Sequence, residues 1–220
     1  MRKLVLALAA ILLLAAAPPA ADWSKTVVRK PDGAFVIGNP KAPKTLVEYA
    51  SYTCSHCAEF SVESTPELEQ QIAAGKVRLE FRHAVRDPLD FTAALLARCA
   101  GPTKFLAATK AFYASQFDWS SRSQAYLKAD KKALAAATPD QARLMVARNG
   151  GLMAVVAPLG VTDAKGAACL LNKAEQQAVL AQSNDAWDRK KIPGTPYFVI
   201  NGAPAGTNLW PEMREALGKP

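Results

Sequence analysis

Two closely spaced cysteines between two strand-like segments constrain the fold of this chain more than any other feature. Residues 45–50 are rich in β-branched and aromatic side chains, and residues 77–81 alternate apolar and charged side chains, so both are predicted strands. Residues 54–74 contain no glycine and carry a broken apolar stripe, which predicts a helix. A strand, a helix and a strand form a βαβ unit, and the sequence Cys-Ser-His-Cys at residues 54–57 lies where the first strand meets the helix.

Glycine and proline mark the limits of these elements. We expect the helix to kink near Pro66 and to end at Gly75. Before the first strand, residues 33–38 predict a short additional strand, whereas residues 22–34 are expected to be an exposed lead-in.

The rest of the chain predicts a helical stretch followed by a hairpin. Residues 88–187 are rich in Ala and Leu and are interrupted by glycine and proline, so we expect several helices and no strand there. Residues 197–200 are strand-like and run into Asn-Gly at 201–202, which is a strong hairpin signal. A closing helix is predicted over residues 209–217, with Asn208 as its N-cap.

This order of elements is typical of an α/β protein with a thioredoxin fold and an inserted all-helical domain. On this interpretation, residues 22–87 and 188–220 form the two halves of the thioredoxin-like domain. Residues 88–187 form the helical insertion. A chain of this length can build one sizeable core with an inserted subdomain.

The first residues predict export. Arg2 and Lys3 precede an apolar run at residues 4–17, and small residues follow it, which is the layout of a cleaved secretory signal over residues 1–21. We expect cleavage near Ala20 or Ala21 and a periplasmic location. The run is shorter than the roughly 20 residues that a membrane helix needs, and an uncleaved membrane anchor is the alternative.

The charge of the chain argues against nucleic acid as a partner. The formal net charge is +8, but the basic residues are scattered, with only short clusters such as residues 189–191. They form no basic stripe with interleaved aromatic residues of the kind that binds nucleic acid.

The four cysteines suggest two different roles. An even number of cysteines in an exported chain favours disulfides. Cys54 and Cys57 are close together, whereas Cys99 and Cys169 are far apart and lie within the helical stretch. We predict that Cys99 and Cys169 form a structural disulfide, and the alternative is two buried free thiols.

The closely spaced pair has the arrangement of a redox site. A cysteine at a helix N-terminus meets unpaired N–H groups and the helix dipole, which lower the pKa of its thiol. The thiolate attacks disulfides and is also a good leaving group. His56 is expected to add a positive charge or a hydrogen bond to the Cys54 sulfur. Half of a zinc site, which would need two further ligands, and a redox-inert disulfide are the alternatives.

Residues 48–57 and 194–202 resemble the DsbA-like thioredoxin family. The order of elements extends this resemblance over nearly the whole chain after residue 21. Pro193 and Pro196 both precede the predicted strand, and the resemblance points to Pro196 as the proline held in the cis form. Ser55 departs from the Pro-His that such oxidases often carry between the cysteines, which leaves the redox strength open.

The resemblance implies a role for each matching residue. Cys54 would be the attacking, partly exposed cysteine and Cys57 its buried partner, and the two would form the redox-active disulfide. The backbone of Thr195, beside Pro196, would pair with the substrate chain. Glu48 would help to move the proton of the buried thiol, although the residue pattern alone also allows an exposed strand glutamate.

The implied activity is that of a dithiol oxidase that introduces disulfides into reduced, unfolded exported proteins. A membrane quinone reductase of the DsbB type would reoxidise it, and neither a diffusible cofactor nor a metal is implied. The absence of room for an N-terminal dimerisation domain in residues 22–43 favours a monomer. The alternatives are a reductase or isomerase of the same fold, or a protein that binds copper(I) through Cys54, Cys57 and His56.

Overall fold

The structure is a computed structural model, and it describes residues 21–218. The predicted signal segment therefore lies, except for Ala21, outside the described residues. The strands are β1 Val27–Arg29, β2 Phe35–Ile37, β3 Lys44–Ala50, β4 Val77–His83, β5 Tyr197–Ile200 and β6 Ala203–Pro204. The helices are α1 Ser55–Ala73, α2 Pro88–Cys99, α3 Pro102–Ala114, α4 Gln116–Ala129, α5 Lys131–Ala136, α6 Pro139–Asn149, α7 Leu152–Val156, α8 Asp163–Leu171, α9 Lys173–Asn184 and α10 Trp210–Leu217. Three short helical turns are η1 Trp23–Lys25, η2 Ala157–Leu159 and η3 Asp185–Arg189.

The strands form one mixed sheet in the order β1-β2-β4-β3-β5-β6. β3 and β4 are parallel and are connected by α1, which confirms the predicted βαβ unit. β5 pairs antiparallel with β3 and turns into β6 at Asn201 and Gly202, both of which have positive φ, so the predicted hairpin is present. α1 runs through Pro66 as a single helix and is followed by Gly75, also at positive φ.

Two local predictions were wrong. The expected lead-in at 22–34 contains η1 and β1, and β1 pairs antiparallel with β2. Three residues are too few to show a strand period in the sequence, so the pairing partner, rather than the local pattern, makes β1 a strand. Asn208 is not an N-cap: Leu209 takes that position without a side-chain bond, and Pro211 in the first turn fixes the start of α10.

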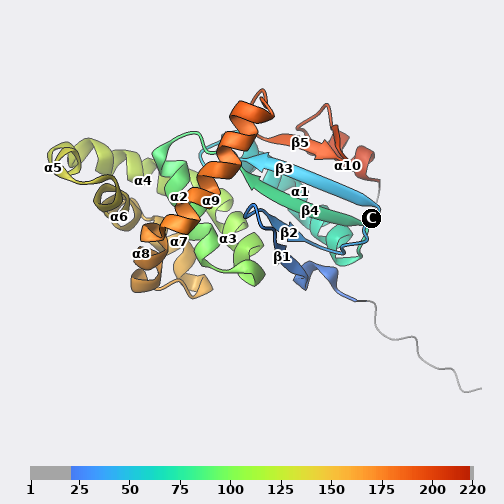
Figure 1. The fold of residues 1–220 in the computed structure, drawn as a ribbon, viewed down its shortest axis with the longest axis horizontal. Coiled ribbons are helices and arrows are strands. Elements are labelled where there is room, and N and C mark those ends of the chain that lie inside the picture. The colour runs from blue at the N-terminus through green and yellow to red at the C-terminus, as the bar shows by residue number, and fades with distance from the viewer. Residues whose placement is uncertain (1–20, 219–220) are drawn as a thin grey trace, which may run out of the picture.

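The helices α2 to α9 lie between β4 and β5 in sequence and stand beside the sheet (Figure 1). In this view α1 lies behind the sheet and α9 crosses in front of one end of it. One hydrophobic core joins the two parts, because the ring of Phe105 on α3 stacks on Phe35 of β2 at 4.1 Å and meets Phe81 of β4 edge-on at 5.4 Å. The predicted α/β fold with helices inserted between its halves is therefore observed, and the inserted helices share the core of the sheet.

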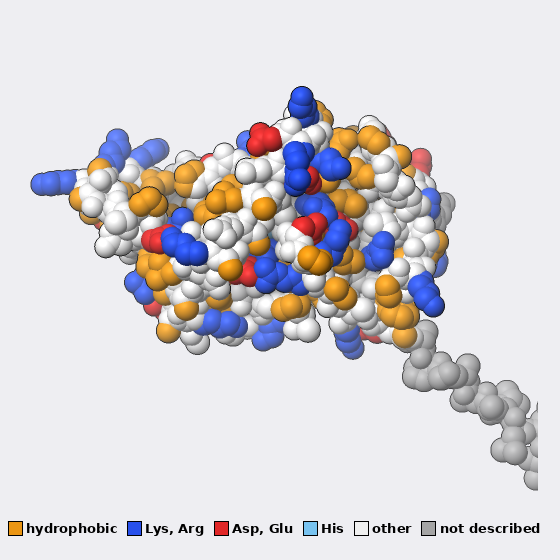
Figure 2. All heavy atoms as spheres, in the orientation of Figure 1, with side chains coloured by type: hydrophobic (Ala, Val, Ile, Leu, Met, Phe, Trp, Pro, Cys, Tyr) orange, Lys and Arg blue, Asp and Glu red, His pale blue; other side chains and the backbone are white. Residues whose placement is uncertain are grey.

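The described surface carries basic and apolar side chains side by side. On the face shown in Figure 2, Lys and Arg side chains are spread over both the sheet and the helices. Within residues 21–218, no single helix is long and apolar enough to cross a membrane. Leu152–Leu159 and Asp163–Leu171, bent by 114° at their junction, satisfy the length and composition requirement only as a pair.

Candidate active site

The two cysteines lie where β3 passes into α1. After β3 the chain makes a tight turn over residues 51–54, closed by the N–H of Cys54 donating to the carbonyl of Ser51 at 3.2 Å. Cys54 is the N-cap residue of α1, with extended φ and ψ of −90° and 119°, and its side chain makes no capping bond. Its sulfur is therefore placed at the positive end of the helix dipole, and Cys57 follows within the first turn.

The Cys54 sulfur faces the loop before β5. Its thiol donates to the carbonyl of Thr195 at 3.0 Å, and the peptide bond between Thr195 and Pro196 is cis. The structure thus brings together Cys54, Thr195 and Pro196, which are far apart in the sequence. The expectation of a partly exposed Cys54 was wrong, because the residue is only 3% exposed with the Thr195 carbonyl against its sulfur.

The two sulfurs, both free thiols here, have opposite acidities. A hydrogen bond from the Cys57 side chain lowers the pKa of Cys54 to about 5, against the opposing effect of burial, and the charge of Arg86 adds a smaller contribution. Burial, and then the hydrogen bond to Cys54, raise the pKa of Cys57 far above its ordinary value. One thiol is therefore poised as a thiolate and the other is kept protonated.

Of the two predicted roles of His56, the hydrogen bond to the Cys54 sulfur is not made. Its side chain is exposed, and its Nδ1 pairs with a carboxylate oxygen of Glu59 at 2.9 Å. That hydrogen bond raises the pKa of His56. The charge of Cys54 makes a smaller contribution to the same rise, so the predicted interaction between the charges of His56 and Cys54 is present. Hydrogen bonds from Cys57 are the main interactions that stabilise the thiolate.

Glu48 is buried on the face of β3 that packs toward α1. Burial raises the pKa of its carboxyl to about 8. Glu48 lines a small cavity of about 30 Å³ together with Tyr113 of α3, whose hydroxyl is buried without a hydrogen-bond partner among the described residues. A glutamate exposed on the strand, the alternative left open by the sequence, is excluded. The negative charge of Glu48 also contributes to the raised pKa of Cys57.

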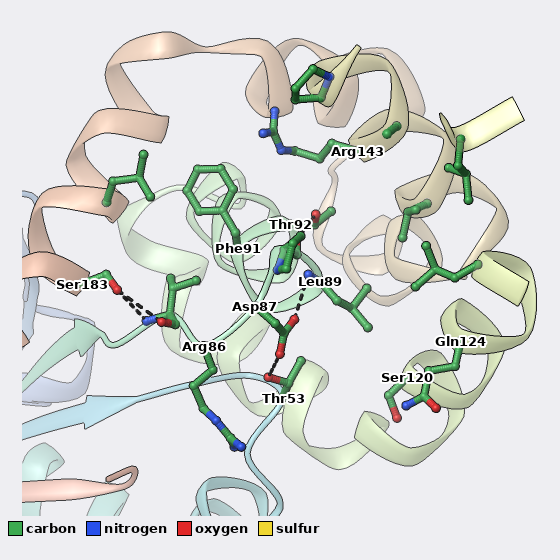
Figure 3. Close-up of a pocket in the computed structure, with 18 of the residues that line it drawn as sticks. Thr53, Arg86, Asp87, Leu89, Phe91, Thr92, Ser120, Gln124, Arg143 and Ser183 are labelled. Atoms are coloured by element: carbon green, nitrogen blue, oxygen red, sulfur yellow. Dashed lines mark hydrogen bonds between the residues drawn. The ribbon is translucent and has the colours of Figure 1, made fainter. Parts of the chain in front are cut away.

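Two residues of the inserted helices and the N-cap residue of α2 contact the turn before Cys54, and the sequence analysis did not identify them. They are Asp87, Asp90 and Gln116. Asp87 precedes Pro88, a recognisable helix start, but nothing local marks Asp90 or Gln116. Figure 3 shows the bond from Thr53 to the Asp87 carboxylate at the edge of a pocket of about 1050 Å³ between α2, α4 and α6.

The other two cysteines form a disulfide elsewhere. Cys99, at the end of α2, is joined to Cys169 of α8 with an S–S distance of 2.02 Å. Across residues 21–218, no three His, Cys, Asp or Glu side chains are grouped so that they could hold a metal ion. Within these residues, no His, Asp or Glu side chain therefore joins Cys54 and Cys57 in such a group.

Comparison with known proteins identifies the family and the fold. The model of the thioredoxin family matches residues 30–219. A protein-disulfide isomerase from Novosphingobium aromaticivorans is 32% identical, the match covers 86% of this chain and 99% of that one, and the TM-score is 0.73. The alpha-DsbA1 protein of Wolbachia pipientis has the same fold, with 21% identity, a TM-score of 0.65 and coverage of 83% of this chain and 87% of that one.

Proteins named for disulfide chemistry are also found among the curated sequences that this chain resembles. A Rickettsia conorii protein, provisionally named as a protein-disulfide oxidoreductase, is 27% identical over 203 residues, which are 91% of this chain. The match spans 65% of the length of that relative. The chain belongs to the thioredoxin family, and its fold is the one seen in the DsbA1 structure.

Proposed function

We propose that this protein is an exported thiol–disulfide oxidoreductase that acts as a dithiol oxidase through Cys54 and Cys57. The observation that carries the proposal is the contrast between the two thiols, because the pKa of Cys54 falls to about 5 while that of Cys57 rises. Thiol–disulfide exchange needs a thiol of low pKa that serves both as nucleophile and as leaving group, which is Cys54 here. It also needs a second thiol beside it, and the buried, protonated Cys57 has that place.

The reaction starts from the Cys54–Cys57 disulfide. A substrate thiolate attacks the Cys54 sulfur, a bond forms between these two sulfurs, and the electron pair of the broken bond goes to Cys57, which takes up a proton. A second thiolate of the substrate then attacks the substrate sulfur that is bonded to Cys54. The new bond joins the two substrate sulfurs, and Cys54 leaves as a thiolate. The substrate loses two electrons and the protein gains them.

Two further residues have roles in this scheme. Glu48, with a pKa of about 8, can hold a proton in the interior at neutral pH and supply it toward Cys57. The carbonyl of Thr195, which now accepts from the Cys54 thiol, is a backbone group with which an extended substrate chain could pair.

The direction of the reaction depends on how the stability of the Cys54 thiolate is linked to the reduction potential of the disulfide. A thiolate that is stabilised in the reduced protein makes the disulfide form easier to reduce, and hence a stronger oxidant. An external oxidant is then needed to restore the disulfide, and a membrane quinone reductase of the DsbB type is the proposed partner. Reduced, unfolded exported proteins are the proposed substrates, with the protein acting as a monomer in the periplasm.

Trapping of mixed disulfides tests the proposed chemistry. In a Cys57→Ser variant the resolving thiol is absent. When Cys54 of this variant is first converted to a mixed disulfide with oxidised glutathione, a reduced polypeptide should displace glutathione as the leaving thiolate. Covalent complexes should then accumulate through Cys54 and disappear on reduction. The matched Cys54→Ser variant should trap none. If neither variant traps a reduced unfolded protein and wild-type protein oxidises none, the proposed function fails.

A reductase or isomerase is the second candidate, because the Novosphingobium relative at 32% identity bears the name of an isomerase. The reduction potential of the Cys54–Cys57 pair separates the two. A value near that of DsbA, about −120 mV, supports the oxidase, whereas a value near that of thioredoxin, about −270 mV, supports the reductase. Copper(I) retained after dialysis would favour the metal-binding alternative instead.

A further inference from the structure

The turn that carries the nucleophile is held by hydrogen bonds from outside the sheet. Asp90 of α2 accepts from the N–H of Tyr52 at 2.7 Å with one oxygen, and from the N–H of Arg86 at 2.9 Å with the other. Asp87 accepts from the Thr53 hydroxyl at 2.6 Å (Figure 3). These two acids fix the donor groups of the turn to the start of α2.

Gln116 fixes the acceptor groups of the same turn. It is the first residue of α4, and its side-chain amide donates to the carbonyl of Tyr52 at 2.8 Å and to that of Cys54 at 2.9 Å. Both amide hydrogens are thus used on carbonyls that flank Thr53. The Cys54 carbonyl also accepts from the N–H of Ala58 in the first turn of α1, so Gln116 joins α4 to the start of the catalytic helix.

The orientation of the Cys54 carbonyl bears directly on the sulfur. The peptide plane after Cys54 sets the direction of the first N–H groups of α1 relative to its side chain. The backbone N–H of Cys57 is one of the groups that lower the pKa of Cys54. In addition, each of the two carbonyl oxygens carries a partial negative charge, and the Gln116 amide offsets it by donating a hydrogen bond.

We propose that Gln116 is a positioning residue for the nucleophile, through which the inserted helices set the reactivity of Cys54. This inference rests on the proposed function, since it concerns the reactivity of the same thiol. Gln116 touches neither sulfur; it acts through the carbonyls of Tyr52 and Cys54. The thioredoxin-like part supplies the cysteines, and the inserted part holds the turn in its reactive form.

The test is a titration of Cys54 in the reduced protein, followed by the ultraviolet absorbance of its thiolate. In Gln116→Glu, a carboxylate replaces the donor and faces the two carbonyls, so the Cys54 midpoint should rise by about one pH unit, a tenfold weaker acid. Gln116→Leu removes the donor without adding charge, and its midpoint should rise by a smaller amount, about half a unit. Alkylation of Cys54 near pH 5 should slow in the same order.

Gln124→Glu is the matched control, because it makes the same change on the same helix and along the same pocket. Its Cys54 midpoint should equal that of wild type. Circular dichroism and the melting temperature of each variant report on folding. A midpoint unchanged in both Gln116 variants, with or without a lower melting temperature, would show a purely structural role and overturn the inference.

Failure of the inference is distinguishable from failure of the proposed function. The titration reports on Cys54 whether or not a substrate is oxidised. If the wild-type protein oxidises substrates and the Cys57→Ser variant traps them, unchanged midpoints in the Gln116 variants remove only the role of Gln116. If the wild-type protein oxidises no substrate and Cys57→Ser traps none, the proposed function is removed, while the midpoints still decide whether Gln116 acts on Cys54.

Discussion

The start of α1 and the contact between α2 and α8 each contain two cysteines, but the surroundings of the two pairs differ. Cys54 and Cys57 are surrounded by a helix start, a backbone carbonyl, a buried carboxyl and the charge of Arg86, all of which act on their protonation. Cys99 and Cys169 join two helices packed in an apolar core that includes Leu96.

The comparison shows that a cysteine acquires its chemistry from the groups around it. Closing a short ring over two intervening residues adds little chain-entropy stabilisation, so the first pair is free to open and close. The second pair closes a loop of 70 residues and is placed to stabilise the fold. Experiments that change the surroundings of one pair should therefore leave the other pair unaffected.

The largest expected effect is on the stability of the reduced protein. The pKa of Cys54 is about 5 in the folded protein, against about 8.5 for a free cysteine. Because the folded value is the lower one, the stabilisation is complete above pH 8.5 and is lost as the pH falls to 5. At about 1.36 kcal/mol per pH unit it amounts to about 5 kcal/mol at high pH and about 3 kcal/mol at pH 7.

Denaturant unfolding of reduced and oxidised protein at pH 5, 7 and 8.5 measures this effect. The reduced form should be the more stable at pH 7 and 8.5, and the difference should almost vanish at pH 5. Mass spectrometry must show that Cys99 and Cys169 remain bonded in both samples. An oxidised form that is equally or more stable at pH 8.5 would contradict the thiolate argument and favour the reductase.

The next effect concerns the other pair. In Cys99→Ala/Cys169→Ala, loss of a constraint on 70 residues should lower the free energy of unfolding by about 4 kcal/mol. The titration midpoint of Cys54 and the rate of exchange should stay within about twofold of wild type. A shift of the Cys54 midpoint would show that the two regions are coupled, and the contrast drawn between them would have to be abandoned.

The smallest effect sharpens the comparison by removing the ionisable carboxyl group of Glu48, close to Cys57. The pKa of Glu48 is raised from 4.5 to about 8 by burial. Below pH 4.5 the carboxyl is protonated in both the folded and the unfolded protein and has no pH-dependent effect on stability. As the pH rises from 4.5 to 8, the carboxyl ionises only in the unfolded protein, and the fold becomes less stable. Glu48→Gln should therefore be more stable than wild type by up to about 3 kcal/mol at pH 7, with little pH-dependent gain at pH 4.5. Thermal unfolding at both pH values measures the difference.

Glu63→Gln provides the control for this variant, since Glu63 lies on the exposed side of the same helix that covers Glu48. Its stability relative to wild type should not change between the two pH values. A Glu48→Gln variant with the same flat profile would mean that Glu48 is ionised in the fold at no cost.

The sequence alone determined the order of the elements and the place of the cysteine motif. The strand pattern before Cys54, the helix after it and the Asn-Gly turn at residues 201–202 are encoded by residues close together in the chain. The resemblance of residues 194–202 also directed attention to Pro196. Periodicity and turn chemistry are local properties, so they can be interpreted without the fold.

The tertiary structure alone decided what surrounds the nucleophile. Thr195 and Cys54 are 141 positions apart, and Gln116 lies 62 positions from Cys54, yet both contact the same residue. His56 was predicted to offer the Cys54 sulfur a positive charge or a hydrogen bond, and its hydrogen bond goes to Glu59 instead, while Cys54 is buried. Such contacts depend on how the inserted helices pack on the sheet, and no short-range pattern encodes that packing, because the residues that meet are brought together only by the shared core.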